Sequence, residues 1–228
     1  MRVIFVRHGH PNYEKNCLTE LGHLQAEAAA ERLSHETVEA IYASSYGRAV
    51  ETAAHIAAKH DLSVNIRDFI CELHWGSVDD QPIFQNGHPW FIADDMIARG
   101  ISLMDPNWGE TERYNRNILV SHVKLVEEGI DEWLYELGYS REGNYYRVTR
   151  ENDSNVILVS HAGSSGAALA HILNLPFPFV CAVLSPDFTG ISILKFTGKE
   201  GELICPRAEL LSDARHIEGI QTETVFEQ

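Results

Sequence analysis

Val3-Ile4-Phe5-Val6 is a run of four apolar residues near the start of the chain, and it leads directly into Arg7-His8-Gly9-His10-Pro11. A short apolar run of this kind predicts a buried strand, and the polar residues after it predict a loop. A second run, Val156-Ile157-Leu158-Val159, is followed in the same way by Ser160-His161-Ala162-Gly163. Each run therefore places a histidine just after the carboxyl end of a predicted strand.

Strands and helices alternate on both sides of the middle of the chain. In the N-terminal part we expect a helix from the N-cap Thr19 to about Ser34, with Leu21, Leu24, Ala28 and Leu33 at helical spacing. Further elements are expected in this part, a strand at 40–43, a helix at 46–60 and a strand at 64–66. In the C-terminal part we expect a helix at 164–173 and closing strands at 179–184, 191–196 and 203–205. This alternation predicts an α/β fold, a three-layer α/β/α sandwich with a mostly parallel central sheet.

Between about residues 77 and 150 the alternation of strands and helices stops. Apolar residues at 90–97 predict one helix, and 111–137 predicts a longer one. The longer helix would carry its apolar residues along one face, at Leu119, Val123, Val126, Ile130 and Leu134. Residues 138–153 are polar with glycines and predict a loop or hairpin. We therefore expect one domain, residues 1–228, with a helical cap inserted at about 77–150.

The charge of the chain excludes several classes of partner. Its 18 basic and 33 acidic side chains give a net charge of −15. Nucleic acids and anionic membranes require a basic face, so neither is expected as a partner. A small phosphate ester is still compatible, because a local arginine cluster reverses the field inside one cleft. No apolar stretch is long enough to cross a bilayer, and the N-terminus does not read as a signal peptide, so a cytoplasmic location is expected.

The four cysteines, Cys17, Cys71, Cys181 and Cys205, lie far apart in the sequence and form no CxxC pair. This spacing does not indicate a zinc site or a thioredoxin-like motif, so we interpret the four residues as reduced structural thiols. No cofactor and no resident metal are expected.

Basic side chains follow three of the predicted strands. Arg7 and His8 follow the first, His161 follows the strand at 155–160, and Arg48 lies in the first turn of the helix after the strand at 40–43. In open α/β sheets, ligands bind outside the carboxyl ends of the strands. We therefore expect these four side chains to meet in one pocket.

Four motifs in the same order resemble the histidine phosphatase superfamily, which includes phosphoglycerate mutases and many phosphomonoesterases. These are Arg7-His8-Gly9, the LTxxGxxQA-like segment 18–26, the SSxxRAxxTA-like segment 44–53, and Ser160-His161-Ala162-Gly163. The segment Ser212-Asp213-Ala214-Arg215-His216-Ile217 is similar to a family tail that packs back near the site. The resemblance covers nearly the whole chain.

The resemblance implies a phosphomonoester phosphatase with a phosphohistidine intermediate on His8. The implied phosphate-binding residues are Arg7, His8, Arg48, His161 and Ala162. The physical chemistry agrees, since arginines make forked hydrogen bonds to phosphoryl oxygens and a neutral imidazole can attack phosphorus. A helix that begins near Gly163 adds a dipole that favours an anion.

The family takes the proton for the leaving group from a carboxylic acid after the third strand. Cys71-Glu72-Leu73-His74-Trp75-Gly76 resembles that segment, so Glu72 is the implied general acid and, in the second step, the base that activates water. The catalytic set is thus Arg7, His8, Arg48, Glu72 and His161. Further candidates for contact with the substrate follow the first motif or precede the cap: His10, Asn12, Asn16 and His74.

Departures from the family pattern favour a phosphatase over a phosphoglycerate mutase. His10-Pro11 stands where many relatives have an acidic or amide residue and then Thr or Ser, and Glu14 stands where many mutases have asparagine. The long insert signatures of the glycolytic mutases are absent. Mutase-type phosphoryl transfer therefore remains the alternative within the family.

Two alternatives belong to other classes. His8-Gly9-His10 has a spacing that could ligate zinc, which would suit a metal-dependent hydrolase. A non-catalytic phosphate-binding module is the other. The expected partner is a small phosphorylated metabolite, with sugar phosphates, nucleotides, phosphoglycerate-like acids and phosphoamino acids all left open, and a homodimer is also left open.

Overall fold

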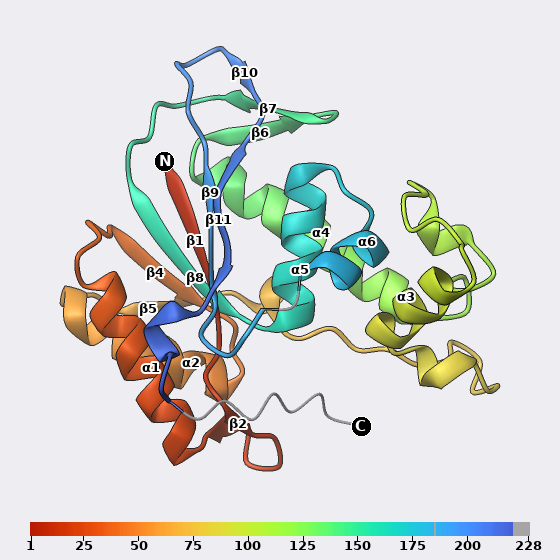
Figure 1. Cartoon of the computed structure of the whole chain (residues 1–228). Helices are drawn as coiled ribbons and strands as arrows, with labels where there is room; N and C mark the ends of the chain where they lie inside the picture. Colours follow the sequence, from red (N-terminus) through yellow and green to blue (C-terminus); the bar gives the residue numbers. More distant parts are fainter. Residues whose placement is uncertain (185, 221–228) are drawn as a thin grey trace.

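A six-stranded sheet forms the centre of the computed structural model, which describes residues 1–184 and 186–220 (Figure 1). Its strands run in the order β11-β9-β1-β8-β4-β5. Their bounds are Arg2–Arg7 for β1, Ala40–Ala43 for β4, Val64–Ile66 for β5, Asn155–Ser160 for β8, Ile191–Lys195 for β9 and Arg207–Asp213 for β11. β1, β8, β4 and β5 pair in parallel, and β9 runs antiparallel to both β1 and β11. The predicted α/β sandwich with a mostly parallel sheet is confirmed.

The register of the two central strands aligns the two histidine motifs. β1 and β8 pair from Arg2 opposite Asn155 to Arg7 opposite Ser160. His8 and His161 therefore leave the sheet side by side at its carboxyl edge. The His8 N–H still donates to the Ser160 carbonyl at 2.9 Å, which extends the pairing beyond the strands.

Helices α1 (Glu20–Leu33) and α2 (Gly47–His60) cover one face of the sheet (Figure 1). Ile4 and Val6 of β1 point to this side and pack with α2 residues such as Ile56. Thr19 caps α1, since its side chain accepts a hydrogen bond from the Gly22 N–H. The predicted apolar face of α1 is only partly correct, because Leu33 is buried but Leu24 is 62% exposed. The other buried residues of the helix are small residues and one glutamine: Gly22, Gln25, Ala26, Ala29 and Ala30.

Helices α4 (Leu119–Glu136) and α5 (Ala162–Leu173) cover the other face, where Val3 and Phe5 of β1 point. All five predicted apolar residues of the long helix are buried in α4. The helix begins at Leu119 rather than at residue 111, because 111–118 forms turns in which Asn117 accepts hydrogen bonds from the N–H groups of Gly76 and Leu119.

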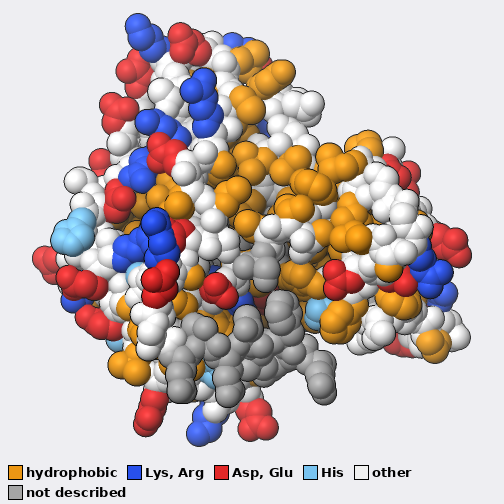
Figure 2. Space-filling view, in the orientation of Figure 1, with side chains coloured by type: hydrophobic (Ala, Val, Ile, Leu, Met, Phe, Trp, Pro, Cys, Tyr) orange, Lys and Arg blue, Asp and Glu red, His pale blue; other side chains and the backbone are white. Residues whose placement is uncertain are grey.

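The rest of the segment before α4 projects away from the sheet and packs on α6 (Phe177–Val183) (Figure 1). It contains α3 (Pro89–Ala98) and the short 3-10 helices η2 (Phe84–Gly87) and η3 (Trp108–Glu110), and it follows η1 (Asp68–Ile70). Apolar side chains gather over α5, α6 and α3 in Figure 2, and charged side chains gather over the other side of the same face. The side chains of Ile97 in α3 and Val183 in α6 are exposed.

Two small sheets complete the fold. The predicted hairpin is present as β6 (Tyr139–Glu142) and β7 (Tyr145–Val148), and β10 (Leu203–Ile204) pairs with β7. β2 (Pro11–Asn12) and β3 (Cys17–Leu18) enclose the loop after the first histidine motif. A last 3-10 turn, η4, spans Arg215–Ile217.

Of the three predicted closing strands, 191–196 is present as β9 and 203–205 as β10, and 179–184 is wrong. Residues 179–184 lie mainly in helix α6, whose Pro178 stands in the first turn, where a missing N–H costs nothing. Residues 203–205 contribute β10, which pairs with the hairpin rather than with the central sheet. The edge strand next to β9 is instead β11, which the sequence patterns did not indicate. In the described part of the chain, no single helix has the length and apolarity to cross a membrane.

Candidate active site

His8 lies at the centre of the carboxyl edge of the sheet and is 1% exposed. Its Nδ1 lies 2.7 Å from the Gly9 carbonyl oxygen. A carbonyl can only accept, so Nδ1 carries the proton and Nε2 keeps its lone pair. Arg48 donates from Nε to His8 Nε2 at 3.2 Å. Burial, and next the Arg7 charge, hold the His8 pKa well below its ordinary value, so the ring is neutral.

His161 faces His8 from the end of β8, with ring centroids 5.1 Å apart. It is fully buried, and its Nε2 lies 2.8 Å from the Ser44 hydroxyl. Its Nδ1 is buried without a hydrogen-bond partner among the described residues. Burial and then the nearby His8 lower the His161 pKa well below its ordinary value.

Arg7 is held from behind by the turn that precedes β9. Its Nη1 donates to the Pro186 carbonyl at 2.7 Å, and its guanidinium lies 4.0 Å from the Phe188 ring centroid. Its Nε is buried with no partner in the described part of the chain. Two buried polar atoms, Arg7 Nε and His161 Nδ1, thus stand unpaired beside the His8 loop and the His8 ring. Buried polar atoms are rarely left unpaired, so both are candidates for hydrogen bonds to a polar ligand.

Arg48 reaches the site from the first turn of α2. Besides His8, it donates from Nη1 to Asn16 Oδ1 at 2.8 Å. Asn16 adopts φ 50°, a left-handed conformation that asparagine tolerates better than most residues. Of the two candidate asparagines, the structure therefore brings Asn16 to the site. Asn12 instead accepts from the Lys15 N–H within its own turn.

Close backbone contacts hold the loop after β1. A Cβ atom on Gly9 would lie 2.5 Å from the Gly22 carbonyl oxygen, which leaves no room for any other residue. The Gly9 N–H donates to Thr52 Oγ1 at 3.0 Å, and Thr52 donates to the Arg48 carbonyl at 2.8 Å. The LTxxGxxQA-like and SSxxRAxxTA-like segments thus both pack directly against the first motif.

Glu72 approaches the site after η1 and lies at the N-terminus of α5. Its Oε1 accepts from the Leu73 N–H at 2.9 Å and from the Ser164 N–H at 3.2 Å. A Cβ atom on Gly163 would lie 2.6 Å from this oxygen, so a glycine is needed for the approach. Burial raises the Glu72 pKa, against the opposing effect of the Leu73 N–H and the charges of Arg7 and Arg48.

Ala162 is the first residue of α5, directly after His161, so its N–H is one of the unpaired amides of a helix start. His10 contacts the Phe188 ring at 5.3 Å between centroids, but its Nδ1 lies 2.9 Å from Thr19 Oγ1. His74 is exposed, and its Nε2 lies 3.2 Å from the Tyr46 hydroxyl.

Tyr46 and the turn at 186–190 are site neighbours that the sequence did not indicate. Tyr46 packs its ring 5.2 Å from that of His161 and 4.9 Å from the Arg48 guanidinium. In the turn, the Thr189 N–H donates to the His8 carbonyl at 3.3 Å. In the sequence, Tyr46 is marked only by its position next to Ser45, and the turn only by its position before strand β9. Such adjacency does not distinguish a residue that contacts the site from one that merely connects two elements.

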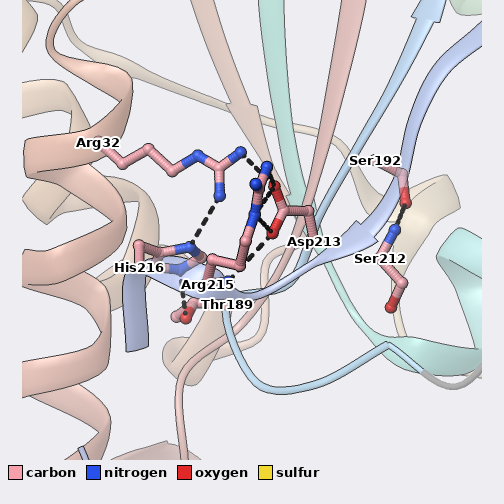
Figure 3. A network of polar contacts seen from close by, with 7 residues as sticks. All are labelled: Arg32, Thr189, Ser192, Ser212, Asp213, Arg215 and His216. Atoms are coloured by element: carbon pink, nitrogen blue, oxygen red, sulfur yellow. Dashed lines mark hydrogen bonds and ion pairs between the residues drawn. The ribbon is translucent and has the colours of Figure 1, made fainter. Parts of the chain in front are cut away.

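The tail segment 212–217 packs behind this turn (Figure 3). His216 Nε2 lies 3.0 Å from Thr189 Oγ1, and Arg32 Nη1 lies 3.4 Å from His216 Nδ1. Asp213 accepts from Arg32 at 2.6 Å and from Arg215 at 2.8 Å. The tail therefore contacts Thr189, whose backbone N–H donates to the His8 carbonyl.

Within the described residues, no three His, Cys, Asp or Glu side chains are grouped so that they could hold a metal ion. In the predicted zinc spacing His8-Gly9-His10, Arg48 donates to His8 Nε2, and the Nδ1 atoms of the two rings face the Gly9 carbonyl and Thr19 Oγ1.

Known proteins share both the sequence motifs and the fold. Residues 3–123 match the model of the histidine phosphatase superfamily (branch 1). The chain is 29% identical over 188 residues to glucosyl-3-phosphoglycerate phosphatase of Mycobacterium tuberculosis, an alignment that covers 77% of this chain and 76% of that protein.

Solved structures give the same result for the fold. Mycobacterial glucosyl-3-phosphoglycerate phosphatase with inorganic phosphate is 25% identical, with a TM-score of 0.64 over 94% of this chain and 98% of that one. Phosphoserine phosphatase of Entamoeba histolytica with 3-phosphoglyceric acid is 18% identical, with a TM-score of 0.64 over 95% of this chain and 98% of that one, and shares the fold. Together with the family match over more than half of its length, this similarity shows that the chain belongs to the histidine phosphatase superfamily (branch 1) and is a phosphohydrolase of that superfamily.

Proposed function

We propose that the chain hydrolyses small phosphomonoesters through a phosphohistidine on His8, without a metal. The observation that carries this proposal is the state of the His8 ring, which is neutral, with its proton on Nδ1 and its Nε2 lone pair next to Arg48. The unpaired Arg7 Nε and His161 Nδ1 supply partners for the phosphoryl oxygens in the same place.

In the first step the phosphoryl group lies between Arg7, Arg48 and His161, with the Ala162 N–H at the start of α5 as a further donor. His161 Nε2 lies 2.8 Å from the Ser44 hydroxyl, and in the tautomer that carries its proton on Nδ1 the ring donates to a phosphoryl oxygen of the substrate. His8 Nε2 attacks phosphorus, a P–N bond forms, and the P–O bond to the leaving group breaks. These groups act mainly by position and charge, as phosphoryl transfer requires.

Glu72 gives its proton to the departing oxygen. Burial favours the protonated carboxyl, and a bound phosphate dianion favours it further. Because Oε1 is held by two backbone N–H groups, Oε2 is the oxygen suited to carry the proton. In the second step the Glu72 carboxylate removes a proton from water, the water oxygen attacks phosphorus, the P–N bond breaks and inorganic phosphate leaves.

The segment that projects from the core serves, in this proposal, as the cap that selects the substrate. Since α4 packs on the sheet and α5, we assign this role to residues 77–118, the first part of the predicted 77–150 insertion. The names of the two similar proteins, glucosyl-3-phosphoglycerate phosphatase and phosphoserine phosphatase, support a small phosphorylated metabolite as the substrate and hydrolysis rather than mutase-type transfer.

The decisive experiment is His8→Ala with p-nitrophenyl phosphate as the substrate. We expect kcat to fall at least about a thousandfold. Catalytic residues that act as a unit fail together, so the loss of the nucleophile alone removes most of the rate enhancement. His35→Ala is the matched control, since His35 is exposed in the connection between α1 and β4. Near-native activity of His8→Ala, or loss of wild-type activity on exhaustive chelation, would refute the mechanism.

A further inference from the structure

Two imidazoles face each other beside the candidate active site. His74 follows Glu72 by two residues, and His122 lies in the first turns of α4. Their ring centroids lie 5.1 Å apart, edge to face. His74 is exposed and His122 is partly exposed, so both can be reached from solvent.

Tyr46 connects this pair to the phosphoryl site. Its hydroxyl lies 3.2 Å from His74 Nε2, and its ring lies 5.2 Å from that of His161. His161, Tyr46, His74 and His122 thus form a continuous row of rings that leads outward from the buried pocket to α4. A substrate whose phosphate lies at His161 would extend its leaving group along this row.

Among the described residues, the pair lacks the carboxylate partners that some imidazoles of this acidic chain have. For example, His55 lies 3.1 Å from Glu27, and His171 lies 2.8 Å from Asp131. Across residues 1–184 and 186–220, no acidic side chain comes within ion-pair distance of His74 or His122. Burial and the neighbouring His74 lower the His122 pKa, which favours the neutral ring with its single N–H donor.

We propose that His74 and His122, together with the Tyr46 hydroxyl, form an anion-binding subsite that takes a carboxylate on the leaving group of the substrate. The proposal rests on the phosphatase function above and narrows its substrate class to phosphorylated carboxylic acids. Two adjacent imidazoles that solvent can reach each offer an N–H donor to a carboxylate, and hydrogen bonds to a charged group are the strong ones. Because Tyr46 and His74 lie between His161 and His122 in this row, the acid lies several bonds from phosphorus, as in a phosphorylated sugar acid.

Inhibition of p-nitrophenyl phosphate hydrolysis by a matched pair of compounds tests the subsite. 6-Phosphogluconate and sorbitol 6-phosphate have the same carbon chain and phosphate, and only the first has a carboxylate. We expect wild-type protein to bind 6-phosphogluconate about tenfold more tightly, in line with one or two charge-assisted hydrogen bonds. The pair 3-phosphoglycerate and glycerol 3-phosphate repeats the comparison with a shorter chain.

The variant His122→Gln should reduce this discrimination to near unity in whichever pair shows it, and His35→Gln should preserve it. If His122→Gln does not fold, His74→Gln replaces it. Equal inhibition by both members of each pair in wild-type protein, failure of all four compounds to inhibit, or unchanged discrimination in a folded variant would overturn the subsite. Absence of any His8-dependent hydrolysis of p-nitrophenyl phosphate would instead overturn the proposed function, so the two failures are distinguishable.

Discussion

The floor and the rim of the candidate active site are held in different ways. On the floor, His8 and His161 are 1% and 0% exposed and emerge from paired central strands. On the rim, His74 is exposed, and its contacts are the Tyr46 hydroxyl and the His122 ring.

This difference suits a fold that keeps the residues of the chemical step apart from the residues that select the substrate. The floor side chains are fixed by the sheet register and by backbone groups such as the Gly9 carbonyl, so their positions do not depend on the substrate. The rim side chains belong to loops and to α4 and have few contacts that fix them. We therefore expect floor variants to slow the hydrolysis of all substrates, and rim variants to alter the choice among them.

Glu72 belongs with the floor, because backbone N–H groups of Leu73 and Ser164 hold its Oε1, and Glu72→Gln gives the largest effect that tests this comparison. The amide cannot donate the required proton, so kcat/KM for alkyl phosphates should fall by about 10² to 10⁴. Aryl phosphates, whose leaving groups need no proton, should lose much less in the first step. The measurement is kcat/KM for glycerol 3-phosphate and p-nitrophenyl phosphate in parallel.

Glu128→Gln is the control, because Glu128 is an exposed residue of α4. Equal losses on the two substrates would remove Glu72 from the acid role and leave it as a structural cap of α5.

The floor could be predicted from the sequence because its signals are local. An apolar run followed by Arg7-His8-Gly9, and another followed by Ser160-His161, place each residue at a strand end without knowledge of distant contacts. Parallel pairing then brings the strand ends together. Asn16 was one of two asparagine candidates, and only the backbone path of the β2–β3 loop distinguished it from Asn12.

The rim and the C-terminal part could not be predicted in the same way. The contact between His74 and His122 joins residues 48 positions apart through the packing of α4, which no periodicity encodes. Residues 179–184 are apolar and partly β-branched, which suits a strand as well as a short buried helix, and packing against α3 and α5 determines the outcome. The buried face of α1 was only partly predicted, because alanine and glycine allow close packing on α2 without a large apolar side chain.

Gly163→Ala tests how tightly the floor is built. The new methyl group would lie 2.6 Å from Glu72 Oε1 and 3.2 Å from Leu73 Cδ1, so the carboxyl must move. A shift of about 1 Å in a catalytic group costs on the order of a hundredfold in rate, and we expect a tenfold to hundredfold fall in kcat. Gly166→Ala in the same helix is the control, since its nearest neighbours lie at 3.8 Å and 3.9 Å. Similar kcat values for the two variants would mean that Glu72 has freedom to move.

His216→Gln gives the smallest effect and tests the support behind the floor. Burial lowers the pKa of His216 to about 4 from an unfolded value of 6.5. Between these values the unfolded chain binds more protons than the folded one, so His216 makes the free energy of unfolding fall as pH decreases from about 6.5 to about 4. Allowing for its partial exposure, the loss from this residue is roughly 1–2 kcal/mol.

Glutamine keeps a hydrogen-bonding group near Thr189 but does not titrate. Urea unfolding at pH 6.5 and pH 4.5 should therefore show a smaller loss of stability in His216→Gln than in wild-type protein. His8 and His161 have lowered pKa values of the same sign, so part of the pH dependence must remain in the variant. The pKa of Asp213 is held far below its usual range by Arg215 and Arg32, and its contribution is lost only at lower pH than this window. An unchanged difference between the two pH values would show that burial does not hold His216 in its neutral form in the folded chain.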